Sequence, residues 1–326
     1  MSAATRTIVA GAALLAAVSL HGCAAATVAS APGASGGSES AIVPATSAAG
    51  VLAAKSELDA GGHERLGDAH VGQGDLERAY FEYREATRLE PGRVSVRFKA
   101  GRLLLRRGLL SEAEEEFRAV LQVQPDSARA LLGLGQAAVL SGKPDAERLL
   151  RDALALEPGL WQAHNLLGLL YEREGSPAKA VVAYNAALAI DPGQGSVTNN
   201  LGVALLRVGN NTQAVLAFKR ALEIGCGDPR VLNNLGLALA RLGRRDEALE
   251  AFRRAGTDAA AWNNLGYLLL TEGKTAEAVD ALEKAVAADP AYFERAHENL
   301  RRARDTKVAP LPGASTGSDP GSVITR

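Results

Sequence analysis

Small residues recur along the chain at one nearly constant interval. Seven glycines follow one another at steps of 34, 34, 33, 34, 34 and 30 residues: Gly67, Gly101, Gly135, Gly168, Gly202, Gly236 and Gly266. A second glycine comes seven residues after each of these, at Gly74, Gly108, Gly142, Gly175, Gly209, Gly243 and Gly273. Self-similarity at a fixed period indicates an internal repeat. We number each copy so that its first glycine is position 8.

The pattern of apolar positions within one copy predicts two helices. Positions 4, 7, 8 and 11 share one face of a first helix, and positions 20, 24 and 27 share one face of a second helix. Position 20 is alanine in most copies, and position 24 is large: Tyr83, Phe117, Leu150, Tyr184, Phe218, Phe252 and Leu282. Small residues allow two helices to approach closely, and the large residues fill the space between them. Each copy is therefore predicted to be a helical hairpin.

Glycine and proline predict where these helices end. The second glycine lies where the first helix must stop, in the left-handed conformation that glycine tolerates best. Proline at position 32 prevents continuation of the second helix in five copies, at Pro91, Pro125, Pro158, Pro192 and Pro290. The third copy lacks one residue near Lys143, and the sixth lacks four between Ala255 and Ala259. We expect the sixth copy to have a shortened second helix.

This combination of positions resembles the tetratricopeptide repeat. The resemblance implies an all-α fold, a right-handed α-solenoid of about seven helical hairpins plus a C-terminal capping helix, because one hairpin cannot bury its apolar face alone. The solenoid is expected over residues 56–304. Its parts are the repeats 60–93, 94–127, 128–160, 161–194, 195–228, 229–258 and 259–292, and the polar cap 293–304.

The first 22 residues have the pattern of a secretory signal peptide, with the cation Arg6 before an apolar run from Ile8 to Leu20. The run ends in Leu20-His21-Gly22-Cys23, which resembles the bacterial lipobox with its lipidated cysteine. This resemblance implies lipid attachment, including palmitate, at Cys23. Cleavage near Ala24, which would leave a soluble periplasmic protein, is the alternative.

The segments that flank the repeats have little charge and no periodicity. Residues 23–55 are mostly Ala, Ser, Gly, Thr and Pro, which predicts a disordered tether after the lipidated cysteine. Residues 305–326 have a similar character and predict a disordered tail. Ala24 directly after the cysteine resembles the sorting pattern of outer-membrane lipoproteins. We therefore expect an outer-membrane lipoprotein of the bacterial cell envelope that faces the periplasm.

Charge and cysteine content argue against several kinds of function. The 326 residues have a formal net charge of -1, so the chain lacks the basic excess with which proteins bind nucleic acid. Its two cysteines, Cys23 and Cys226, cannot form a four-thiolate zinc site. Cys226 replaces the closing proline of the fifth copy and is expected to be a buried or loop thiol.

Two short segments resemble catalytic motifs, but their residue spacing does not match those motifs. His63-Glu64 could begin a zinc-protease helix, but the second histidine would be required at the position of Gly67. Gly273-Lys274-Thr275 resembles the end of a phosphate-binding loop, but the earlier glycine would be required at Leu268. We therefore predict a protein that is not an enzyme, without catalytic residues, cofactor, metal or small-molecule substrate.

A partner-binding groove is predicted on the concave side, along the first helices. Positions 2, 9 and 13 point away from the face that packs inside the hairpin, and positions 5, 6 and 12 lie beside them. Positions 5 and 6 are both asparagine in three consecutive copies: Asn199 and Asn200, Asn233 and Asn234, Asn263 and Asn264. A side-chain amide donates and accepts at once, which suits the backbone of an extended peptide. The alternative is that these asparagines bond the adjacent helix.

Two further sets of residues complete the predicted groove. Position 9 is apolar in the later copies, at Leu169, Val203, Leu237 and Tyr267, and position 13 is basic at Arg173, Arg207 and Arg241. Exposed apolar stripes mark binding sites, although position 9 could instead contact the neighbouring first helix. The arginines could instead complement the helix dipole. The expected partner is a peptide or helix segment of an envelope protein, with apolar anchors and some acidic residues.

The lipobox, the tether and the repeats with Asn-Asn-Leu-Gly together resemble the TadD-type lipoproteins of Flp (tight-adherence) pilus assembly. This resemblance implies a non-enzymatic scaffold for protein-protein interaction, which binds a partner segment during assembly of a pilus or secretion system. Two alternatives have a similar plan. One is a pilotin-like factor that assists secretin assembly in type IV pili, and the other is a scaffold for exopolysaccharide export.

Overall fold

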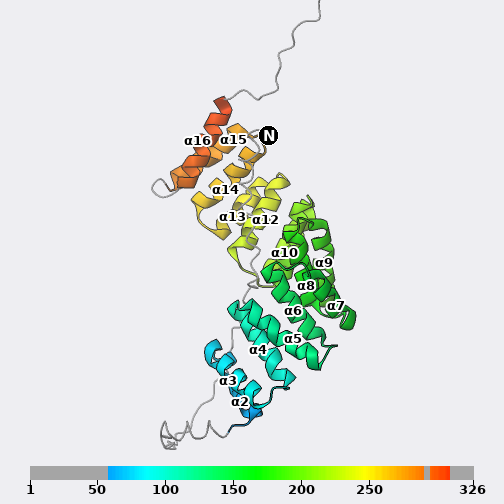
Figure 1. The fold of residues 1–326 in the computed structure, drawn as a ribbon. Helices are drawn as coiled ribbons and strands as arrows, with labels where there is room; N and C mark the ends of the chain where they lie inside the picture. Colours follow the sequence, from blue (N-terminus) through cyan, green and yellow to red (C-terminus); the bar gives the residue numbers. More distant parts are fainter. Residues whose placement is uncertain (1–57, 290–293, 309–326) are drawn as a thin grey trace, which may run out of the picture. The chain divides into compact units, whose positions relative to one another are not determined.

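The computed structural model describes residues 58–289 and 294–308, and these residues form helices joined by short turns (Figure 1). The predicted signal peptide, the lipid site Cys23, the tether and the end of the predicted tail lie outside the described residues. The all-α fold of sequential hairpins is as predicted. None of the helices in the described part of the chain has both the length and the apolar character of a membrane span.

The described chain divides into two units, one that ends at Val197 and one that begins at Thr198. The first unit contains four hairpins, one for each of the first four predicted repeats. Their helices are α2 (Ala60–Gly72), α3 (Leu76–Leu89), α4 (Val94–Arg107), α5 (Leu110–Val123), α6 (Ala128–Ser141), α7 (Ala146–Leu156), α8 (Trp161–Arg173) and α9 (Pro177–Ile190). Within this unit each second helix also packs against the next first helix, as α3 does against α4 and α5 against α6.

Helix α10 (Gly195–Arg207) begins before the division and ends in the second unit. The other helices of that unit are α11 (Asn211–Glu223), α12 (Pro229–Arg241), α13 (Arg245–Ala255), α14 (Asp258–Thr271), α15 (Thr275–Ala288) and α16 (Glu294–Val308). They pack in the same order as in the first unit, with α11 on α12, α13 on α14 and α15 on α16. Cys226, between α11 and α12, is buried with 2% of its surface exposed.

The glycine at position 8 allows the two helices of a hairpin to approach closely. A Cβ atom added to Gly168 would lie 2.3 Å from Cε1 of Tyr184, and one added to Gly236 would lie 2.5 Å from Cε1 of Phe252. In the other hairpins the nearest atom of the position-24 side chain would lie 2.4 to 2.9 Å from such a Cβ atom. Position 8 therefore has no room for a side chain, which is the close packing that the sequence predicts.

The second glycine of each copy ends the first helix in the predicted way. These seven glycines all have positive φ, between 72° and 83°. At Gly108, which follows α4, the backbone N–H donates to the carbonyl of Leu105 at 3.1 Å, while the N–H of Leu109 donates to Leu104 at 3.0 Å. These bonds satisfy carbonyl groups that the end of a helix would otherwise leave unpaired.

The irregular sixth repeat has the short second helix that its missing residues predict. Helix α13 has 11 residues, whereas α15 in the next repeat has 14. Its C-cap is Gly256, and Thr257 then caps α14 by accepting a hydrogen bond from the backbone N–H of Ala260 at 3.2 Å. The chain therefore passes from α13 to α14 without the usual proline turn.

Helix α16 follows the register of an eighth first helix. Ala296, Leu300 and Ala303 are buried, and they occupy positions 3, 7 and 10 if Glu294 is position 1. The helix contacts α15 and also α14, as a first helix contacts the two helices before it. Position 8 is then Arg301, which is exposed. The helix ends at Val308, so its last turn extends into the segment that the sequence assigns to the tail.

Candidate partner-binding surface

The predicted surface lies on the first helices, which contact one another within each unit. Helix α6 packs against both α4 and α8 in the first unit, and α14 packs against both α12 and α16 in the second. Positions 5 and 6 lie at these contacts between consecutive first helices, as the hydrogen bonds described next show. Side chains at these positions can therefore serve the neighbouring repeat, a partner, or both.

In the second unit, asparagines connect consecutive first helices. Nδ2 of Asn264, at position 6 of the seventh repeat, donates to Oδ1 of Asn233, at position 5 of the sixth, at 3.3 Å. Nδ2 of Asn299 in α16 donates to Oδ1 of Asn263 at 2.9 Å. Three of the six asparagines thus have the contact with an adjacent helix that the sequence left as the alternative. Asn299 belongs to the same row but was not recognised in the sequence, because the cap has no glycine signature.

The other three predicted asparagines differ in their surroundings. Asn199, Asn200 and Asn234 are half-buried. Oδ1 of Asn199 is buried without a hydrogen-bond partner among the described residues. These side chains keep hydrogen-bonding capacity that the repeats around them do not use.

The apolar residues at position 9 are not equally accessible. Leu169 in the first unit is 8% exposed and belongs to the core, so the expected exposure of this residue is wrong. Val203, Leu237 and Tyr267 in the second unit are half-buried. A helical pattern shows that position 9 faces away from its own hairpin, but it does not show how much of it the neighbouring first helix covers.

The arginines at position 13 are exposed, and two of them reach back to the preceding first helix. Nη1 of Arg241 in α12 donates to the backbone carbonyl of Leu206 in α10 at 3.1 Å. Arg173 in α8 makes the same contact with the carbonyl of Val139 in α6. Both acceptors are at position 12, in the last turn of the preceding first helix, where carbonyl groups lack partners within the helix. Arg207 is exposed at the corresponding position of α10.

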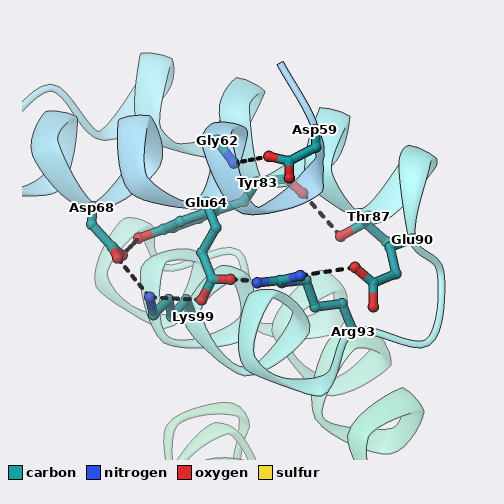
Figure 2. A network of polar contacts seen from close by, with 9 residues as sticks. All are labelled: Asp59, Gly62, Glu64, Asp68, Tyr83, Thr87, Glu90, Arg93 and Lys99. Atoms are coloured by element: carbon teal, nitrogen blue, oxygen red, sulfur yellow. Dashed lines mark hydrogen bonds and ion pairs between the residues drawn. The ribbon is translucent and has the colours of Figure 1, made fainter. Parts of the chain in front are cut away.

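In the first unit, charged side chains occupy positions 5 and 6 of neighbouring first helices, where the second unit has asparagines (Figure 2). Nζ of Lys99, at position 6 of the second repeat, lies 2.8 Å from Oε1 of Glu64, at position 5 of the first, and 2.6 Å from Oδ2 of Asp68. Nε of Arg93 donates to the other oxygen of Glu64 at 2.7 Å. The opposite charges of Glu64 at position 5 and Lys99 at position 6 are the sequence signal for this network. The network was not predicted.

This network and the burial around it shift the pKa values of Glu64 and Tyr83. Burial alone would raise the pKa of Glu64, but hydrogen bonds from Lys99 and Arg93 outweigh it and hold that pKa below its usual value. Burial raises the pKa of Tyr83, and its hydrogen bond to Asp68, at 2.8 Å, raises it further. A neutral phenol and an ionised carboxylate therefore connect α2 with α3 and α4, and the first two repeats use these polar groups internally.

His63 has a structural partner. Its Nδ1 lies 2.7 Å from Oε2 of Glu82 in α3, and the two residues are 6% and 0% exposed. The histidine that begins the rejected zinc-protease string is therefore part of a buried pair inside the first hairpin. Among the residues described, no three His, Cys, Asp or Glu side chains form a cluster that could hold a metal ion.

Three family models, each described as a tetratricopeptide repeat, match this chain. They cover residues 70–136, 140–195, 199–258 and 259–292, which together are more than half of the chain. The chain belongs to the tetratricopeptide repeat family. Proteins of this family are scaffolds for protein-protein interaction and are typically not enzymes.

One curated relative agrees with this family assignment and indicates no particular function for this chain. Tetratricopeptide repeat protein 7A of Homo sapiens is 33% identical over 116 residues, which are 35% of this chain and 14% of that protein. This chain thus spans a small part of the length of the curated relative that it matches.

Two solved structures have a similar fold. The Cut9-Hcn1 hetero-tetramer of the APC/C matches with a TM-score of 0.52 and 20% identity, over 74% of this chain and 47% of that chain. A tetratricopeptide repeat protein from Parabacteroides merdae matches with a TM-score of 0.50 and 17% identity, over 75% of this chain and 98% of that chain. At these identities the likeness concerns the fold alone.

Proposed function

We propose that this protein is a non-enzymatic adaptor, anchored to the outer membrane by a lipid on Cys23 and facing the periplasm. It binds a segment of another envelope protein during assembly of a pilus or secretion system, in the manner of the TadD-type lipoproteins that it resembles. The family supports the role of scaffold. The apolar run that ends in Leu20-His21-Gly22-Cys23 supports the anchor.

The observation that carries the binding role is the character of the first helices in the second unit. Val203, Leu237 and Tyr267 are apolar or aromatic and remain partly accessible, and Asn234 lies half-buried among the same helices. Interfaces combine such apolar anchors with nearby polar groups. This surface can therefore bury apolar side chains of a partner while its amides bond the partner's backbone.

The pairing between repeats leaves part of the amide row available. An amide has two donor hydrogens and an oxygen with two lone pairs. The bond from Asn264 to Asn233 uses one hydrogen of Asn264 and one lone pair of Asn233, so both hydrogens of Asn233 and both lone pairs of Asn264 remain. The pair therefore still offers donors and acceptors, which is what the backbone of an extended segment requires.

Photo-crosslinking in intact cells would test this surface. With a photoreactive benzoylphenylalanine in place of Tyr267, irradiation is expected to attach the protein covalently to one envelope protein, because Tyr267 lies on the proposed contact. The measurement is the shifted band in a gel and its identification by mass spectrometry. The matched control carries the probe at Leu216, which is 56% exposed on the second helix α11. Equal adducts at both positions, or none at Tyr267, would contradict the proposal.

A separate labelling experiment tests the anchor. The native chain is expected to incorporate radioactive palmitate, and the Cys23→Ser variant is expected to lose this label, because only a cysteine at the lipobox position accepts the lipid. Equal incorporation by both, or none in either, would show that Cys23 is not the attachment site. Binding at the first helices could then still be correct for a soluble periplasmic protein, so the two experiments separate the two parts of the proposal.

A further inference from the structure

Helix α9, the second helix of the fourth repeat, has an apolar outer face. Val182 is 70% exposed and Ile190 is 41% exposed, although both are large apolar residues. Ala178, Asn185 and Ala189 are exposed on the same side of the helix as Val182, whereas Ile190 lies about 80° further round. The exposed Lys179 lies about 60° from Val182, on the side of Ile190, and its Nζ is 5.5 Å from the ring centre of Tyr171 in α8. Burial within the hairpin accounts for the inner face of α9, but not for this outer face.

The other second helices carry charge where α9 has none. At the position of Asn185 they have exposed charged residues, which are Arg84, Arg118, Arg151, Lys219, Arg253 and Glu283. At the position of Val182, four second helices carry charge, at Glu115, Arg148, Glu250 and Asp280, while α3 and α11 have the exposed apolar residues Phe81 and Leu216. Folding of a hairpin therefore does not require an uncharged outer face. The absence of charged residues from these positions in the fourth repeat is therefore a feature of α9 itself.

The spacing on this face is that of a helix-packing seam. Ala178, Val182, Asn185 and Ala189 follow one another at intervals of four, three and four residues, so they form a single stripe along the helix. The two alanines at its ends allow the backbone of another helix to come close. The stripe is therefore shaped to receive a helix rather than an extended strand or a small ligand.

We propose that this stripe (Ala178, Val182, Asn185 and Ala189) binds the same stripe on a second copy of the chain. A two-fold contact places one patch against itself, so the patch must be self-complementary. None of its four residues is charged, and the two Asn185 amides can donate to and accept from each other. A polar asparagine within an apolar seam is also a known device for specifying register. A partner with charged side chains would find no opposite charge in the stripe.

The proposed contact is small. One helix of 14 residues contributes the face, so the contact belongs with small interfaces that bury less than about 1,200 Å² in total. Interfaces of this size give weak, concentration-dependent association. We therefore expect a monomer-dimer equilibrium in the micromolar range or weaker. This inference does not depend on the lipid anchor or on the partner proposed for the first helices.

Sedimentation equilibrium of the full chain tests the inference. The average mass of the native chain is expected to rise toward that of a dimer as its concentration is raised to several hundred micromolar. Val182→Glu is expected to weaken this association at least tenfold, because two buried carboxylates would face each other. The variant should fold normally, since Glu115 and Glu250 occupy the same position in α5 and α13. Circular dichroism checks the fold.

Two further variants make the result specific. Asn185→Arg introduces the residue type that α3, α5 and α13 carry at this position, and it is also expected to abolish association. Phe81→Glu changes an exposed apolar residue at the position of Val182 in α3 and is expected to associate like the native chain. A native chain that stays monomeric throughout, or α9 variants that associate as the native chain does, would overturn the proposal.

Discussion

Replacing Gly202 with leucine is expected to destabilise the second unit by about 1 to 3 kcal/mol or more. A Cβ atom at this position would lie 2.5 Å from Cε1 of Phe218, whose side chain is fully buried and cannot move into solvent. The helices α10 and α11 would have to separate to admit the leucine. Thermal unfolding followed by circular dichroism measures the effect. Because repeats interact with their neighbours, the loss is expected to include partial unfolding.

Gly72 provides a control for the general effect of losing a glycine. It lies in helix α2, and a Cβ added there would meet nothing within 4 Å. Gly72→Ala is therefore expected to leave stability unchanged or to raise it by about 0.5 to 1 kcal/mol, because alanine loses less conformational freedom in a helix. An unchanged unfolding midpoint for Gly202→Leu would show that α10 and α11 do not pack as closely as described.

The second large effect is expected in the first hairpin, where Glu82→Ala should cost about 1 to 3 kcal/mol. The change removes the carboxylate that lies 2.7 Å from Nδ1 of His63 and leaves the imidazole buried without this partner. The pair connects α2 to α3, so α2 should lose its protection first. Hydrogen exchange of the backbone amides in α2, measured by mass spectrometry, reports this local opening.

Glu116 is the matched control because it occupies the position of Glu82 in the second repeat. Its carboxylate lies 3.1 Å from Nη1 of Arg97, and about one fifth of each side chain is exposed. Glu116→Ala is expected to cost about 1 kcal/mol or less, since water can reach the partner that remains. If the two variants were equally destabilised, the depth of the His63 pair would not be the cause.

The hairpins themselves could be predicted because backbone geometry and side-chain volume depend on a few residue types. A glycine at Gly168 opposite Tyr184 has a steric reason that any reader of the sequence can state, and the structure confirms it. The left-handed glycines that end the first helices have an equally local cause. The shortened α13 follows directly from residues that the sixth repeat lacks.

The contacts between repeats were harder to predict. A helical wheel places Asn264 and Leu169 on the side away from their own hairpins, but it contains no information on the next helix. In the structure Asn264 bonds Asn233, and Leu169 is buried. An amide suits a neighbouring amide as well as a partner's backbone, so the residue type alone does not decide between them.

The uncharged face of α9 was also missed, although the sequence contains the necessary signal. The predicted groove contains only residues of the first helices, and the second helices were predicted from the residues that pack inside each hairpin. Aligning the second helices would have shown Asn185 where the other copies carry Arg, Lys or Glu. A missing charge is a weaker signal than a recurring residue, because it becomes visible only against the other copies.

Helix α16 has a consequence for how such an array can grow. It takes the register of a first helix but has Arg301 where every other first helix has the glycine that admits a second helix. Arg301 therefore leaves no room for a second helix to pack on α16 as closely as in the seven hairpins. A duplicated 34-residue unit keeps the close hairpin packing if it is inserted before α16, so this helix acts as the terminator of the regular array.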